Sequence, residues 1–271
     1  MEGFFFVLLP KFTEIYYICG IIVNSMLRKL TILLFLLILS ANCYAQKTKE
    51  NTNQSQKMKV EIWSDIVCPF CYIGKRHFEM ALKSFENAAD VEIVWKSYQL
   101  DPEMPKKQIL KQNVYEYLAV RKGISTEQSK ALHDNVVKMA NAAGLNYNFD
   151  KTVVASSFDG HRLIQLAKSK GLGDAAEESL FKAYFIEGKD IAEHETLLNL
   201  GKEIGLDESA IKAMLQSDQY SNEVKRDIQQ SVQIGIGGVP YFLIDGRYAV
   251  SGAQPVSVFL QTLQKAIKGK K

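Results

Sequence analysis

Cysteine and histidine are both scarce in this sequence. The 271 residues include four cysteines and four histidines, the latter being His77, His133, His161 and His194. So few cysteines exclude a small disulfide-stapled scaffold, which needs several bridges to hold its fold. A structural zinc site usually combines four cysteine or histidine ligands at short spacings, and no histidine pair here has that spacing. We therefore expect neither a metal nor a bound cofactor.

Long basic runs are also missing, and the apolar run that precedes the first strand signal is short. The formal net charge of +3 is spread along the chain, which gives no electrostatic support for nucleic-acid binding. The apolar run at residues 30–39 follows Arg28 and Lys29 and precedes a small-residue segment that ends at Ala45. A basic start, a run too short for a comfortable membrane span and a small-residue end are typical of a secretory signal peptide.

This leader predicts export, with the periplasm as the expected destination. We expect cleavage after Ala45, so that residues 26–45 are the signal peptide and residues 1–25 lie upstream of the natural start. Residues 46–57 are polar and aperiodic, and are expected to form a flexible tether. A retained N-terminal membrane anchor is one alternative, and a cytoplasmic protein that starts at Met58 is another. Cleavage would leave only Cys68 and Cys71 in the mature chain.

The hydrophobic pattern predicts two halves of one mixed sheet, separated by helices. Alternating apolar residues indicate a strand over 58–64, followed by a helix from Pro69 to about residue 88 and a second strand over 91–98. Residues 58–104 thus form the first half of the sheet.

The middle and the end of the chain differ in character. Residues 105–216 have helical patterns throughout and are expected to form an inserted subdomain, in which Ser125 with Gln128 has the pattern of a capping box. Residues 217–271 return to the sheet through a helix, a hairpin at Asp245-Gly246 and a last helix. The sequence therefore predicts an α/β protein with a large helical insert.

The chemistry-bearing motif lies between the first strand and its helix and reads Cys68-Pro69-Phe70-Cys71. A helix N-terminus presents unpaired N–H groups and the positive end of the helix dipole, which favour a thiolate over a thiol. We expect Cys68 to be exposed at that end and Cys71 to lie one turn further in, within reach of a mixed disulfide. Pro69 stiffens the turn, whereas Phe70 offers neither charge nor hydrogen bond.

Four further residues are candidates for this site. Pro240 precedes a strand, where it is tolerated as a cis bond facing the cysteines, with Val239 left to pair with a substrate; an ordinary trans proline is the alternative. Asp65 either modulates the protonation of the cysteine pair or, as we favour, caps the helix. His161 either lines a substrate groove or has a packing or solvated role, which is the interpretation we favour.

Four segments carry a resemblance to the DsbA-like family, in particular to its FrnE-like dithiol–disulfide branch: residues 62–76, 183–188, 237–246 and 251–255. The resemblance implies a thioredoxin fold with a helical insert, Cys68 as the nucleophile, Cys71 as the resolving thiol and Pro240 in cis. It also implies thiol–disulfide exchange with exported proteins, a membrane-bound or soluble redox partner, and glutathione as a candidate small thiol. Phe70 stands where the strongly oxidising members have histidine, so their oxidising strength does not carry over.

Two other functions remain open. The same superfamily contains glutathione-dependent transferases and isomerases, although two cysteines in the motif argue against that activity. A periplasmic holdase, which binds unfolded chains without redox turnover, is the non-enzymatic alternative.

Overall fold

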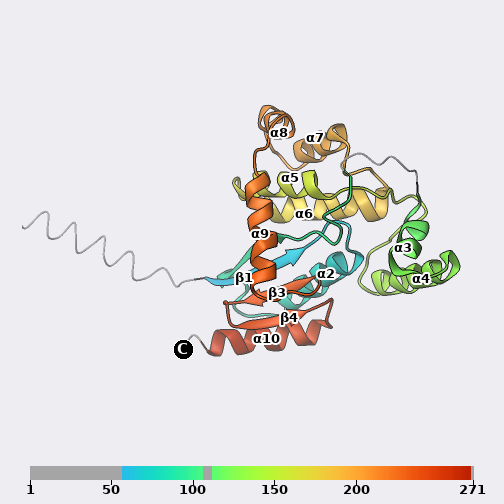
Figure 1. The fold of residues 1–271 in the computed structure, drawn as a ribbon. Helices are drawn as coiled ribbons and strands as arrows, with labels where there is room; N and C mark the ends of the chain where they lie inside the picture. Colours follow the sequence, from blue (N-terminus) through green and yellow to red (C-terminus); the bar gives the residue numbers. More distant parts are fainter. Residues whose placement is uncertain (1–56, 106–111, 270–271) are drawn as a thin grey trace, which may run out of the picture. The chain divides into compact units, whose positions relative to one another are not determined.

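The computed structural model describes residues 57–105 and 112–269 of the chain (Figure 1). The expected signal peptide and almost all of the expected tether lie outside these residues. Within them, no helix is both long enough and apolar enough to cross a membrane.

The sheet has four strands in the order β2-β1-β3-β4. Strand β1 (Met58–Ser64) pairs in parallel with β2 (Val91–Ser97) and antiparallel with β3 (Tyr241–Ile244), which forms a hairpin with β4 (Tyr248–Ser251). The predicted turn at Asp245-Gly246 is confirmed, since both residues have the positive φ angles, 53° and 65°, that a tight hairpin needs. The strand next to the cysteine motif is therefore central in the sheet.

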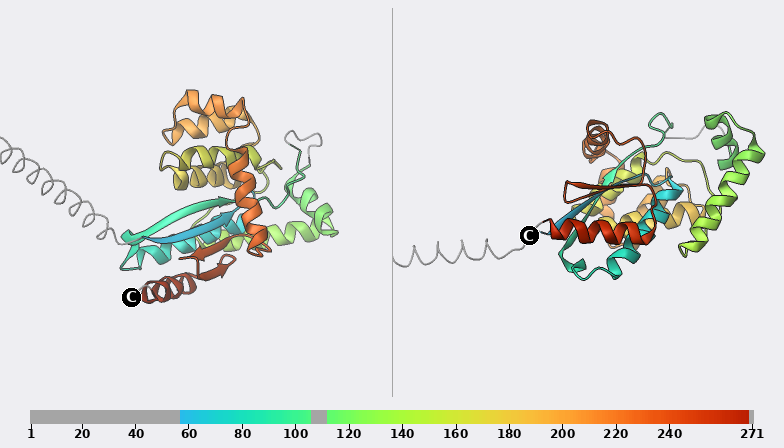
Figure 2. Two further views of the ribbon diagram at one scale, coloured as in Figure 1. Left: turned by 60° about the vertical axis from the view of Figure 1, so that its left-hand side comes forward. Right: turned by 90° about the horizontal axis from the view of Figure 1, so that it is seen from below.

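Helices cover both faces of this sheet (Figures 1 and 2). Helices α2 (Pro69–Lys83) and α10 (Val256–Lys268) pack on one face, where the rings of Phe78, Phe242 and Phe259 contact one another. Helix α9 (Ser221–Gln233) lies on the other face, where Trp63 Nε1 donates to the Asp227 carbonyl oxygen at 3.0 Å. The packing on both faces holds β1 between these helices, and α2 begins shortly after β1 ends.

Helix α2 is shorter than the predicted helix. It ends at Lys83 rather than near residue 88, and Ala88–Asp90 forms a separate 3₁₀ turn, η1. Fifteen residues of helix and seven of strand both span about 23 Å. The chain therefore has to turn at this point if β2 is to return beside β1 in parallel.

The insert is built from helices around a non-helical loop. Its elements are α3 (Val114–Lys122), α4 (Thr126–Ala142), α5 (Phe158–Lys168), α6 (Gly173–Lys182), the π-helical turn η2 (Ala183–Glu187), α7 (His194–Glu203) and α8 (Glu208–Leu215). The predicted capping box of Ser125 and Gln128 is confirmed. The expectation of an all-helical insert is wrong for residues 143–157, where Val153 instead forms a β-bridge with Asn113. The predicted order of strands, helical insert and returning hairpin is confirmed.

Candidate active site

The two cysteines lie at the N-terminus of α2, where the motif predicts them. Cys68 is the N-cap residue, Pro69 is the first helical residue, and the Cys71 N–H donates to the Cys68 carbonyl oxygen at 3.0 Å. Both cysteines are free thiols. No side chain caps this helix end, so its positive dipole faces the cysteine pair.

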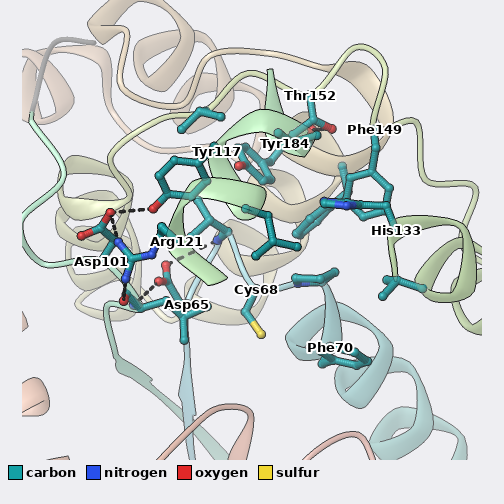
Figure 3. A pocket seen from close by; sticks show the side chains of 18 of the residues that line it. Asp65, Cys68, Phe70, Asp101, Tyr117, Arg121, His133, Phe149, Thr152 and Tyr184 are labelled. Atoms are coloured by element: carbon teal, nitrogen blue, oxygen red, sulfur yellow. Dashed lines mark hydrogen bonds and ion pairs between the residues drawn. The ribbon is translucent and has the colours of Figure 1, made fainter. Parts of the chain in front are cut away.

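Cys68 is buried, and the expectation that it is exposed is wrong. Its side chain is 3% exposed and that of Cys71 is 1% exposed. Cys68 is buried because of the tertiary structure: it lies on the wall of a cavity of about 700 Å³ that the insert helps to enclose. Cys71 does not line this cavity. Reagents therefore reach Cys68 through the cavity (Figure 3).

The cavity is mostly apolar and combines three parts of the chain. The motif supplies Cys68, Pro69 and Phe70, and the loop before β3 supplies Gly238 and Val239. The insert supplies aliphatic and aromatic side chains from α3, α4, the 143–157 loop and η2: Leu118, Leu132, Val136, Met139, Phe149, Val154, Tyr184 and Phe185. A cavity of this size and character suits an apolar side chain or a small organic molecule.

Polar groups gather at one end of this cavity. Arg121 forms an ion pair with Asp101, and Tyr117 Oη donates to Asp101 Oδ2 at 2.5 Å (Figure 3). On the aromatic wall, burial lowers the pKa of His133, so this imidazole is neutral at pH 7. Asp65 and Lys122 also line the cavity, so acidic and basic side chains balance and the cavity offers little net charge to a ligand.

The Val239–Pro240 peptide bond is cis, as predicted. The Cys68 thiol lies 3.5 Å from the Val239 carbonyl oxygen. Gly74 of α2 allows the helix to pack closely against Pro240, since a Cβ atom at this position would lie only 2.9 Å from Pro240 Cγ. The sequence analysis did not single out Gly74, whose significance depends on a contact between distant segments.

Asp65 does not cap α2, so the favoured interpretation of this residue is wrong. Its backbone carbonyl accepts from the Cys68 N–H at 2.9 Å, and no side chain forms a capping hydrogen bond at the N-terminus of α2. Oδ2 accepts from the Leu100 N–H at 2.7 Å, and His161 Nε2 lies 3.4 Å from Oδ1. Asp65 therefore ties the motif to the loop after β2.

His161 is buried at 1% exposure and is not among the residues that line the cavity. It faces Asp65 from α5, so it lies behind the motif rather than in a substrate groove, and a packing role fits this position.

Comparison with known proteins identifies relatives across most of the chain. The family model of the DSBA-like thioredoxin domain matches residues 59–264. A probable DsbA oxidoreductase from Streptomyces coelicolor is 40% identical, with a TM-score of 0.74, over 78% of this chain and 90% of its own. The YwbO protein of Bacillus subtilis is 27% identical over 78% of this chain and 98% of its own. The cytosolic disulfide reductase DsbM from Pseudomonas aeruginosa, at 16% identity and TM-score 0.55 over 78% of this chain and 98% of its own, shares the fold.

Proposed function

Because this chain belongs to the DSBA-like thioredoxin domain family, we propose that it is a dithiol–disulfide oxidoreductase that uses Cys68 as nucleophile and Cys71 as resolving thiol. The observation that carries this assignment is the unequal access of the two thiols: the cavity opens on Cys68 and not on Cys71. The attacking thiol must meet the substrate, whereas the resolving thiol only has to meet its neighbour.

The chemistry follows from the position of Cys68 at the helix N-terminus. Its thiolate, favoured by the free N–H groups and the dipole of α2, attacks a substrate disulfide and releases one substrate thiolate. Cys71 then attacks the sulfur of Cys68 in the mixed disulfide, which releases the second substrate thiolate and leaves the Cys68–Cys71 disulfide. The same steps in reverse oxidise a substrate dithiol.

Purified protein tests this function directly. It should reduce insulin with dithiothreitol as electron donor and reactivate scrambled ribonuclease in a glutathione buffer. A holdase would suppress aggregation without either activity, and a transferase would conjugate glutathione to an aromatic electrophile. Either of these last two patterns, without disulfide exchange, would overturn the proposal.

We further propose that the substrates are exported proteins. The support is the leader at residues 26–45, which has the three regions of a signal peptide. N-terminal sequencing of the protein from its native host should begin at Gln46. Cytoplasmic protein that begins at Met58 would contradict export and leave the redox assignment intact.

The cavity predicts a preference for substrates with an apolar side chain near the reactive cysteine. Val136→Trp places an indole in the cavity from α4, and it should lower kcat/KM about tenfold for a peptide disulfide with phenylalanine next to cysteine. The reason is the loss of roughly 1.5 kcal/mol of apolar burial. The rate with a small disulfide such as hydroxyethyl disulfide should change much less.

Lys138→Trp is the matched control, because Lys138 is an exposed residue of the same helix and does not line the cavity. It should leave both rates unchanged. Equal losses for the peptide and the small disulfide in Val136→Trp would mean that the cavity gives access to Cys68 without selecting the substrate.

A further inference from the structure

A hydroxyl group beside Cys71 is hydrogen-bonded to a carboxyl group of the insert. The Ser64 hydroxyl, at the end of β1, and the Asp65 backbone N–H, one residue further on, lie close enough to the Cys71 thiol to lower its pKa, although burial outweighs them. Ser64 Oγ in turn donates to Glu177 Oε1 of helix α6 at 2.6 Å. Ser64 is 1% exposed and Glu177 is 2% exposed. A carboxyl group of the insert is thus one hydroxyl away from the second cysteine.

Cys71 needs a proton acceptor at this position. Burial raises the pKa of the Cys71 thiol well above its usual value, so at neutral pH the group is a thiol. Only the thiolate attacks a disulfide, and bulk water does not reach a side chain this deeply buried. Resolution therefore requires a base within the protein.

Glu177 has the properties of such a base. Burial raises its pKa from 4.5 to about 7, so that both the acid and the carboxylate are populated near neutral pH. A proton acceptor is most effective when its pKa lies close to the working pH.

We propose that Glu177, acting through the Ser64 hydroxyl, accepts the Cys71 proton when the mixed disulfide is resolved. This inference rests on the proposed redox function. The Cys71 S–H proton passes to Ser64 Oγ as the Ser64 proton passes to the Glu177 carboxylate. The Cys71 thiolate then forms a bond with Cys68 Sγ, and the bond between Cys68 and the substrate sulfur breaks with its electron pair leaving on the substrate. When the dithiol is regenerated, the proton returns by the same route.

Other ionisable groups surround Glu177 but are less suited to this role. Asp65 meets Cys71 through its backbone N–H, while its carboxylate faces the Leu100 N–H and His161. The ionisable groups that interact electrostatically with Glu177 include His161 and Lys168 of α5, Lys75 of α2, and Asp174 of α6. The Ser64–Glu177 bond is the link from this group to Cys71.

The experiment separates attack from resolution. Reduced protein is mixed in a stopped-flow instrument with a fluorescently labelled glutathione disulfide between pH 5 and 9, and the formation and resolution of the mixed disulfide are followed as two phases. Glu177→Gln should slow resolution about 10- to 100-fold near pH 7 and remove its inflection, with attack unchanged. Ser64→Ala should slow resolution similarly, and Ser64→Thr, which keeps a hydroxyl, should restore most of the rate.

Glu178→Gln is the matched control, since Glu178 is the adjacent acid on α6 and faces Arg76 and Tyr72. A second readout follows the ionisation of Glu177 without catalysis. Its folded pKa of about 7 exceeds its unfolded value of 4.5, so the free energy of unfolding should fall as pH rises between these values. This component should be missing in Glu177→Gln.

The outcomes distinguish the two proposals. If the wild-type protein shows no attack phase, the redox function itself fails. If attack occurs but Glu177→Gln keeps the rate and inflection of resolution, or if Glu178→Gln slows resolution as much, the proton-acceptor role is overturned. A loss confined to resolution, with Ser64→Thr active, supports it.

Discussion

Cys68→Ser should lower the rate of disulfide exchange by a factor on the order of 10³ or more, because the proposed nucleophile is lost. The fold should remain, since the two cysteines are free thiols in the folded structure and no bridge is removed. Cys71→Ser should behave differently. Attack by Cys68 is still available, but the thiol that resolves the mixed disulfide is missing, so covalent adducts with substrate proteins should accumulate.

Non-reducing gels of both variants in the native host provide the measurement, with thermal melting as the check on folding. Adducts should appear for Cys71→Ser and disappear on reduction. If they appear mainly for Cys68→Ser, the roles of the two cysteines are reversed. If both variants retain full activity, the pair is not catalytic and the holdase becomes the better interpretation.

Asp227→Ala should lower the free energy of unfolding by about 3 kcal/mol, because it removes one partner of a buried ion pair. Asp227 of α9 lies at 6% exposure, and its carboxylate accepts from the Ser97 N–H at 3.2 Å and from Gln165 Nε2 at 2.7 Å. It also pairs with Lys96 Nζ at 3.1 Å. One carboxylate therefore connects α9 to strand β2 and to helix α5 of the insert.

Urea unfolding followed by circular dichroism measures this loss. Lys225→Ala is a suitable control, since Lys225 is an exposed residue of the same helix and its removal should change stability by less than about 0.5 kcal/mol. A loss below about 1 kcal/mol in Asp227→Ala would show that water or a rearranged lysine replaces the missing carboxylate. The insert would then be held to the sheet mainly by apolar packing.

Several features followed from the sequence because they depend on short stretches of chain. The strand–motif–helix order, Pro69 at the first helical position, the Ser125 capping box and the Asp245-Gly246 hairpin are each set by neighbouring residues. Local steric and hydrogen-bonding rules are sufficient for such features. The cis bond before Pro240 came instead from the family resemblance, since local rules left trans open.

The remaining features needed the tertiary structure, because they join residues that are far apart in the sequence, from 35 positions for Asp65 and Leu100 to 113 for Ser64 and Glu177. Cys68 is buried because the insert and the loop before β3 close around it. Asp65, only three residues from the motif, turns towards Leu100 and His161 rather than towards the helix. Ser64 and Glu177 are 113 residues apart, and no local pattern indicates their contact. The sequence by itself singled out the two thiols that we propose as the redox pair, whereas the packing of the insert decided which of them faces the cavity and which groups surround the other.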